Sequence, residues 1–131
     1  MKPTRTKKQT YELPLPSEHE EQVSFFSEVH LNTQRYPHWE FIFAIPNGGH
    51  RHVVVAAKLK AEGVKRGVPD ICIPFPRGRY HGMYIEMKKK GNTTSPKQKE
   101  YLVFLESVGY VTVVCYSATE AMKMLKWYEK L

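Results

Sequence analysis

The sequence lacks the features of membrane and secreted proteins. It has no run approaching the roughly 20 apolar residues that a membrane-spanning helix needs, and its lysine-containing start has no apolar signal segment. Only two cysteines are present, Cys72 and Cys115, each inside an apolar run, and no Cys-x-x-Cys pair exists to favour a structural zinc site. We therefore expect a cytoplasmic protein that does not contact a membrane, with both thiols reduced and buried.

The chain also has too few residues for more than one domain, since 131 residues support a single hydrophobic core. Its charge is unbalanced: 20 lysines and arginines against 13 acidic residues give a net charge of +7. A small basic protein tends to bind polyanions, most commonly nucleic acid, although a merely soluble basic surface would have the same composition. We interpret residues 1–16 as a flexible basic arm and residues 17–131 as one domain.

Hydrophobic periodicity and turn residues predict eight elements in the order α-β-α-β-β-α-β-α. The expected helices run from Ser17 towards Pro37, over 51–62, over 95–109 and from Ser117 onwards, and the expected strands cover 41–45, 70–75, 83–88 and 110–116. The last of these strands is almost continuously apolar, which is typical of a central strand. The order predicts an α/β fold, a four-stranded mixed sheet flanked by helices on both faces.

Finer patterns predict the ends and the buried sides of the helices. Ser17 with Glu20 and Ser117 with Glu120 have the spacing of capping boxes, and Ser95-Pro96 is typical of a helix start. The residues expected on buried faces are Val23, Phe26, Val29 and Thr33 in the first helix, Tyr101, Leu105 and Val108 in the third, and Ala121, Met122, Leu125 and Tyr128 in the last.

Three charged side chains on neighbouring strands indicate the chemistry. Asp70 begins one strand after a Gly-Val-Pro turn, and Glu86 and Lys88 lie two residues apart in the next. Because side chains alternate along a strand, Glu86 and Lys88 point to the same face. Two carboxylates and an ammonium at one sheet edge are what a metal-assisted phosphodiester hydrolase needs. The alternatives are a turn aspartate that caps local amides and an exposed ion pair.

Other polar residues are weaker candidates. Glu18, Glu21 and Gln22 share one face of the first helix, where acids are favoured by the helix dipole in any case. Gln98 lies in the first turn of the third helix, either near the site or simply on the surface. His50 and His52 form a His-x-His pattern that lacks a third zinc ligand, whereas Asn47 and Arg51 are better placed as substrate contacts.

Five short motifs, in this order, resemble those of the VRR-NUC domain, a branch of the PD-(D/E)XK nuclease superfamily of phages, bacteria and eukaryotic repair nucleases. The motifs lie at residues 18–22, 46–51, 63–70, 86–88 and 95–98, and the resemblance extends over residues 17–131. It implies a PD-(D/E)XK nuclease core in a stand-alone domain of phage or bacterial type. It also implies that the protein acts in the cytoplasm of a bacterium or of a phage-infected cell.

The resemblance also implies roles for individual residues. Asp70 and Glu86 bind a divalent metal, Mg²⁺ or Mn²⁺, with the Met87 carbonyl as a further ligand, and Lys88 orients or activates the attacking water. A glutamate of the first helix completes the site; Glu18 is our choice and Glu21 the competing one. Supporting catalytic residues are Gln22 and Gln98, and DNA is held by Asn47, Arg51, Lys65, Arg66, Lys89, Lys90 and Lys97.

Small members of this family resemble Holliday junction resolvases, which are symmetric dimers. We therefore expect a homodimeric endonuclease that cleaves branched DNA in repair, because a two-fold dimer presents two active sites to a two-fold junction. Three alternatives remain: a nuclease acting on linear duplex DNA, a non-catalytic nucleic-acid-binding module, and a ββα-metal nuclease built around Asn47, His50 and His52.

Overall fold

The computed structural model describes residues 14–46 and 53–131. The helices are α1 (Glu18–Leu31), α2 (Val53–Ala61), α3 (Pro96–Ser107) and α4 (Ala118–Glu129), and the strands are β1 (Phe43–Ala44), β2 (Ile71–Ile73), β3 (Met83–Met87) and β4 (Val111–Cys115). A short 3-10 helix, η1 (Pro37–Phe41), lies between α1 and β1 and was not predicted. The predicted order is therefore confirmed, with strands shorter than expected.

The four strands form one mixed sheet in the order β1-β2-β3-β4. β1 pairs with β2 and β2 with β3 in antiparallel fashion, whereas β3 and β4 are parallel. The prediction that the 110–116 strand is central was wrong, because β4 lies at an edge of the sheet. Its apolar character has another cause: α3 packs against it from one side and α4 from the other.

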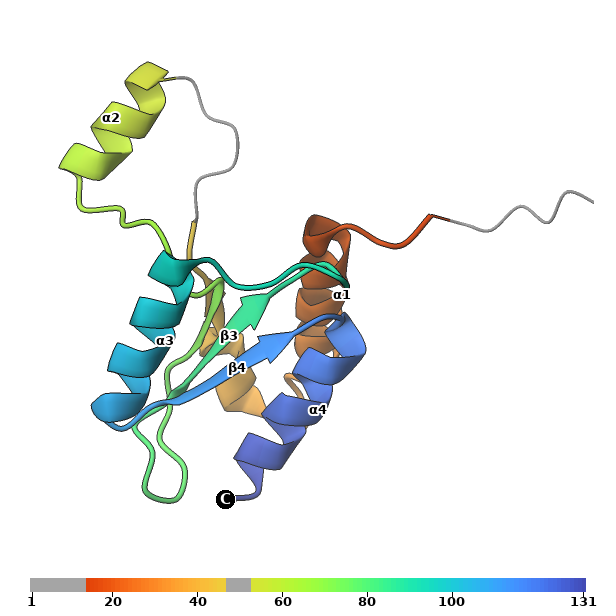
Figure 1. Cartoon of the computed structure of the whole chain (residues 1–131). Coiled ribbons are helices and arrows are strands. Elements are labelled where there is room, and N and C mark those ends of the chain that lie inside the picture. Colours follow the sequence, from red (N-terminus) through yellow and green to blue (C-terminus); the bar gives the residue numbers. More distant parts are fainter. Residues whose placement is uncertain (1–13, 47–52) are drawn as a thin grey trace, which may run out of the picture.

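The helices cover both faces of the sheet, as predicted (Figure 1). α1 and α4 pack together on one face, over a core that includes Ile71, Ile85, Met87 and Leu125. α3 lies on the opposite face. The two cysteines are buried free thiols, again as predicted. Within the part of the chain that the structure describes, no helix is long and apolar enough to cross a membrane.

The predicted buried face of the first helix is only partly right. Val29 is buried, but Phe25 takes the central position, and Val23 is 51% exposed. Thr33 lies in the turn after α1. The difference arises because α4 covers the side of α1 that carries Phe25 and Val29, so that the side carrying Val23 stays open. In α4, by contrast, all four predicted residues are buried: Ala121, Met122, Leu125 and Tyr128.

Serine side chains begin three of the helices, as predicted. In α1 the Ser17 hydroxyl accepts the Glu20 N–H at 3.1 Å, and in α4 the Ser117 hydroxyl accepts the Glu120 N–H at 3.1 Å. The second half of the capping box is absent at both places. The Glu20 carboxylate instead accepts the Ser17 hydroxyl, and the Glu120 carboxylate accepts the Tyr116 N–H. Among the helices whose first turn and cap the structure describes, only α3 has the complete box, in which Ser95 and Gln98 exchange both bonds.

Two helices have no buried residue. In α3 the predicted buried stripe was wrong: Tyr101 and Leu105 are half-buried and Val108 is 44% exposed, because α3 rests against the edge of the sheet. α2 stands apart from the sheet in Figure 1. Gly63 follows this helix with a φ of +97°, a backbone conformation that favours glycine.

A polar cluster fixes the end of α4. The Glu129 carboxylate accepts the Trp39 Nε1–H at 3.0 Å and pairs with Arg77 at 2.9 Å and His38 at 2.7 Å. Burial alone would raise the pKa of Glu129, but the hydrogen bonds from these three side chains outweigh it, and the pKa is lowered. The cluster therefore ties α4 to η1 and to the turn between β2 and β3.

Candidate functional site

Asp70 and Glu86 come together at one end of the sheet. Ile71 of β2 is paired with Ile85 of β3, and continuing this antiparallel register by one residue sets Asp70 opposite Glu86. The Met87 N–H donates to Asp70 Oδ2 at 2.7 Å, which holds the aspartate against the end of β3. Asp70, the only aspartate in the chain, therefore shares a site with Glu86, as the sequence pattern predicted.

The Glu86 carboxyl group is almost completely removed from solvent. Glu86 is only 2% exposed, and it is the one charged residue in the buried part of the described chain. Its Oε1 accepts a hydrogen bond from Gln98, whereas its Oε2 is buried and has no hydrogen-bond partner among residues 14–46 and 53–131. Burial raises the pKa of Glu86 to about 8, and the negative charge of Asp70, a hydrogen bond to Asp70 that favours the protonated form of Glu86, and the negative charge of Glu18 add to the rise, which Lys88 opposes.

Gln98 is oriented by the start of its own helix. Its Oε1 accepts the Ser95 N–H at 2.8 Å to close the capping box, so its amide nitrogen points the other way. That nitrogen donates to Glu86 Oε1 at 3.0 Å. The capping box at the start of α3 therefore also positions a donor on the buried carboxylate, and Gln98 reaches the site.

The loop before β2 is pressed against the first turn of α3. Gly67 has a φ of +82°, and a Cβ placed on it would lie 2.8 Å from the backbone carbon and oxygen of Lys97. Pro69, two residues on, is fully buried. Gly67 is needed both for its backbone conformation and for this close approach, which fixes Asp70 relative to Gln98. Apart from the Gly-Val-Pro turn itself, no sequence pattern indicated this contact.

The two glutamates left open by the sequence have different positions. The Glu18 carboxylate accepts the Lys89 N–H at 3.0 Å, immediately after β3. The Glu21 carboxylate accepts the Ala118 N–H at 2.6 Å and therefore caps the start of α4. Glu18 is near enough to Glu86 to raise its pKa. Of the two glutamates, only Glu18 acts on the pKa of Glu86, and the capping role of Glu21 was missed because its partner is 97 residues away in the sequence.

Lys88 acts on the acid pair, whereas Gln22 is placed only in a groove on α1. The Lys88 N–H donates to the Cys115 carbonyl at 2.9 Å, which extends the parallel pairing of β3 and β4 by one residue and keeps Lys88 on the face of Glu86. Its positive charge acts on Glu86 directly. Gln22 lines a shallow groove on α1.

The donor atoms at this edge suit a hard cation. Mg²⁺ and Mn²⁺ prefer carboxylate, carbonyl and water oxygens, and a buried carboxylate oxygen without a partner is a natural ligand. In the described part of the chain, no three histidine, cysteine, aspartate or glutamate side chains gather closely enough to hold a metal together. A cation between Asp70 and Glu86 would therefore draw its other ligands from water and from backbone oxygens such as that of Met87.

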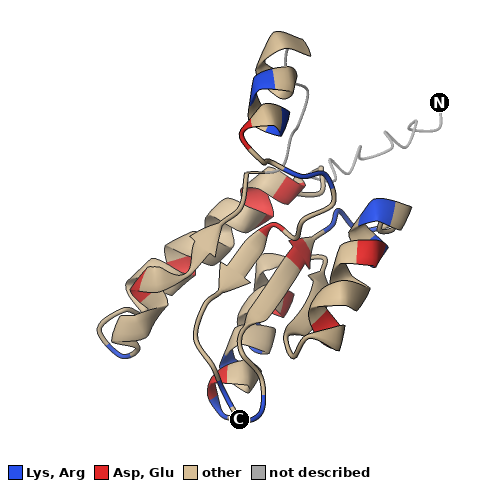
Figure 2. Ribbon diagram, turned by 90° about the vertical axis from the view of Figure 1, so that its left-hand side faces the viewer, with Lys and Arg blue, Asp and Glu red and all other residues tan. Residues whose placement is uncertain are grey.

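The predicted DNA contacts are exposed where the structure describes them. This holds for Lys65, Arg66, Lys89, Lys90 and Lys97. At the upper end of Figure 2, basic stretches lie on α2, on the loop after it and at the start of α3. Lys97 also pairs with Glu100 at 3.4 Å. Asn47 and Arg51, and the alternative zinc ligands His50 and His52, lie outside the described residues.

Comparison with known proteins identifies a family and a solved structure with the same fold. The model of the VRR-NUC domain matches residues 6–119, most of the chain. The chain belongs to the VRR-NUC family. This is a nuclease family, so the substrate class is nucleic acid. A solved structure titled "VRR_NUC domain protein" is 33% identical, covers 91% of this chain and 93% of its own, and superposes with a TM-score of 0.74. No curated protein matches the chain.

Two glycines of this VRR-NUC domain provide a matched test of the loop contact. Gly63 and Gly67 both have positive φ, but a Cβ on Gly63 would meet nothing within 4 Å. We expect Gly63→Ala to lower the free energy of unfolding by about 1 kcal/mol through backbone strain alone. Gly67→Ala adds the clash with Lys97 and should cost about 1–3 kcal/mol more. Urea unfolding measures both, and equal losses would contradict the contact.

Proposed function

We propose that this VRR-NUC domain is a divalent-metal-dependent endonuclease that hydrolyses DNA phosphodiester bonds and prefers branched DNA such as Holliday junctions. It would serve DNA repair in the cytoplasm of a bacterium or of a phage-infected cell. The observation that carries the proposal is the buried Glu86 carboxylate beside Asp70, with one oxygen left without a partner among the described residues. A buried carboxylate of this kind is costly unless it serves a ligand.

The residues present fit Mg²⁺ or Mn²⁺. Asp70 and Glu86 would supply carboxylate oxygens and Met87 its carbonyl. The Glu18 carboxylate adds negative charge beside them from the start of α1, without joining the two acids closely enough to form a three-carboxylate cage among the described residues. When bound there, the cation would polarise the scissile phosphate and acidify a coordinated water. Gln98 keeps Glu86 in place through its bond to Oε1, which leaves Oε2 available to a ligand.

Lys88 supplies the positive charge on the same face as Glu86. Its ammonium orients the attacking water and stabilises negative charge that develops on the phosphate. Water attacks in line and the 3′ oxygen leaves. Gln22 supports the site from α1. The exposed basic residues bind backbone phosphates on either side, a contribution that weakens steeply with salt.

The exposed apolar residues of α2 favour a homodimer. Val53, Val54 and Val55 are 79%, 69% and 47% exposed, and no residue of this helix is buried. The first turn of α2 is apolar, whereas Lys58 and Lys60 lie in its last turn. Neighbouring exposed apolar residues of this kind are typical of an interaction surface. A second copy would bury these valines, and a two-fold pair of sites would match the two-fold symmetry of a junction.

The catalytic assignment is tested by cleavage. A labelled four-way junction and a linear duplex of the same sequence are incubated with Mg²⁺ or Mn²⁺ and wild type, Asp70→Asn or Glu40→Gln. We expect the wild type to prefer the junction, and Asp70→Asn to cut at least about 100-fold more slowly, because a metal ligand is lost. Glu40→Gln, which neutralises an exposed acid on η1, should match the wild type.

Each contrary result identifies a different alternative. Equal cleavage of both substrates would support a nuclease for linear duplex DNA. Salt-sensitive binding without cleavage would support a non-catalytic module. Full activity of Asp70→Asn would contradict the site itself.

The dimer is tested by Val53→Glu, with Val103→Glu as the matched control. Val53 begins α2, where a carboxylate is compatible with the helix dipole, and Val103 is a similarly exposed valine on α3, at 66%. Sedimentation velocity should show a dimer for the wild type and the control, and a monomer for Val53→Glu. A dimer that tolerates Val53→Glu would contradict the role of α2.

A further inference from the structure

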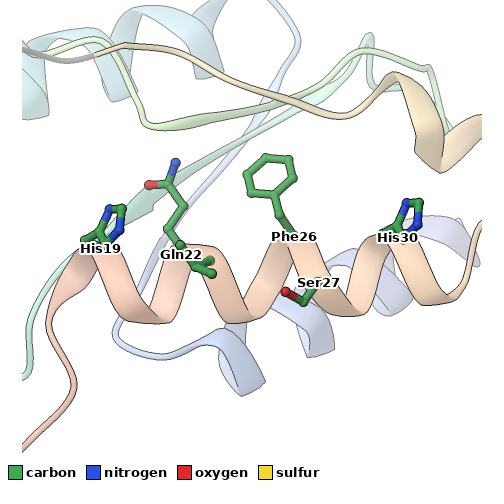
Figure 3. A pocket seen from close by; sticks show the side chains of 6 residues that line it. His19, Gln22, Phe26, Ser27 and His30 are labelled. Carbon is green, nitrogen blue, oxygen red and sulfur yellow. The ribbon is translucent and has the colours of Figure 1, made fainter.

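A shallow groove of about 500 Å³ follows one side of α1. Its volume is within the range of ordinary ligand sites. In Figure 3 the side chains of His19, Gln22, Phe26 and His30 extend from the same side of this helix, with the Phe26 ring between Gln22 and His30. The lining consists of His19, Gln22, Val23, Phe26, Ser27 and His30. This is the side of α1 that α4 does not cover. Val23 lies on this side and is therefore exposed.

One end of the groove is next to Glu18 in the sequence. His19 follows Glu18, whose carboxylate accepts the Lys89 N–H at the end of β3. From there the groove extends to His30, near the other end of α1. The helix between these two histidines rises by about 16 Å, the length of about five stacked nucleotides. A strand that leaves the site along α1 would therefore stay in the groove for several nucleotides.

Charge is distributed unequally around α1. The helix carries four glutamates, and none of them lines the groove. The groove instead presents imidazole, amide and hydroxyl groups, which can donate hydrogen bonds to phosphates and to the edges of bases. The side of the helix that faces the groove is therefore the side that a polyanion can approach.

Phe26 provides a fixed aromatic surface in the groove. Its ring packs edge-to-face on Phe25, with centroids 5.4 Å apart and an interplanar angle of 84°, and Phe25 is fully buried. Phe26 itself is only partly buried, so part of the ring is accessible. Exposed aromatic rings with neighbouring donors are the usual means of binding unpaired bases.

We propose that the α1 groove binds a single-stranded segment of the DNA substrate, with a base stacked on Phe26. This proposal rests on the proposed function, because the single-stranded segment in the groove would belong to the same DNA strand that is cleaved at Asp70 and Glu86. A duplex keeps its bases stacked on one another and cannot present one to the ring. Branched DNA offers unpaired nucleotides at the branch point, so the groove would contribute to the preference for branched substrates.

Two serines on α1 allow a matched test. Ser27 lines the groove and Ser24 does not, and both are exposed. Ser27→Trp should fill the groove, whereas Ser24→Trp adds the same bulk elsewhere on the helix. Binding of a fluorescein-labelled thymidine decamer, and of a duplex of equal length, is measured by anisotropy in EDTA so that no cleavage occurs. Thermal unfolding confirms that both variants are folded.

We expect Ser27→Trp to raise the Kd for the single strand about tenfold, the effect of losing one stacked base, and to change duplex binding less than about twofold. Ser24→Trp should match the wild type for both. His30→Ala, at the far end of the groove, should weaken single-strand binding about threefold without adding bulk. Equal single-strand affinities of the two tryptophan variants would overturn the proposal.

The same protein samples separate this proposal from the catalytic one. If Ser27→Trp and Ser24→Trp bind the single strand equally while the wild type cuts DNA and Asp70→Asn does not, only the groove proposal fails. If the binding difference is found but Asp70→Asn cuts normally, the groove stands and the assignment of Asp70 fails.

Discussion

The burial of one carboxyl group organises the rest of this structure. Glu86 is in the third strand of the sheet, 2% exposed, beside a second carboxylate and with one oxygen that no described residue satisfies. Such a group costs free energy in a folded protein unless it is protonated or binds a cation. Its pKa of about 8 reflects that cost, with burial as the first cause. The surrounding contacts all fix the position of this one group and of Asp70.

Four elements of the fold contribute these contacts: β2, β3, α3 and α1. The antiparallel register of β2 and β3 sets Asp70 beside Glu86, and the Met87 N–H holds it there. α3 contributes Gln98, and the close approach of Gly67 ties the Asp70 loop to the same helix turn. α1 closes the edge with Glu18. The opposite end of the molecule is fixed separately, by the Glu129 cluster, so the acid pair is not needed to hold α4 in place.

The sequence predicted the element order, the mixed sheet and the Asp70–Glu86 pair, because strand alternation and capping patterns are local signals. It failed where the answer depends on partners distant in the chain. β4 was expected at the centre because it is apolar, but its cover comes from α3 and α4. Glu21 could not be separated from Glu18 because its partner, Ala118, is far away in the sequence. At Gly67 the sequence likewise predicted only a turn, because the close approach to Lys97 exists only in the folded protein.

The most direct test of this account is calorimetric titration of the metal-free protein with Mn²⁺ at about pH 7, in two buffers of different ionisation enthalpy. With a pKa of about 8, the Glu86 carboxyl group is mostly protonated at this pH, and a cation must displace its proton. The account predicts saturable binding at one site with release of close to one proton, and the Glu86→Gln variant should lose both. Binding without proton release, or equal Mn²⁺ affinity of the Glu86→Gln variant and the wild type, would contradict the central role given to the buried carboxylate.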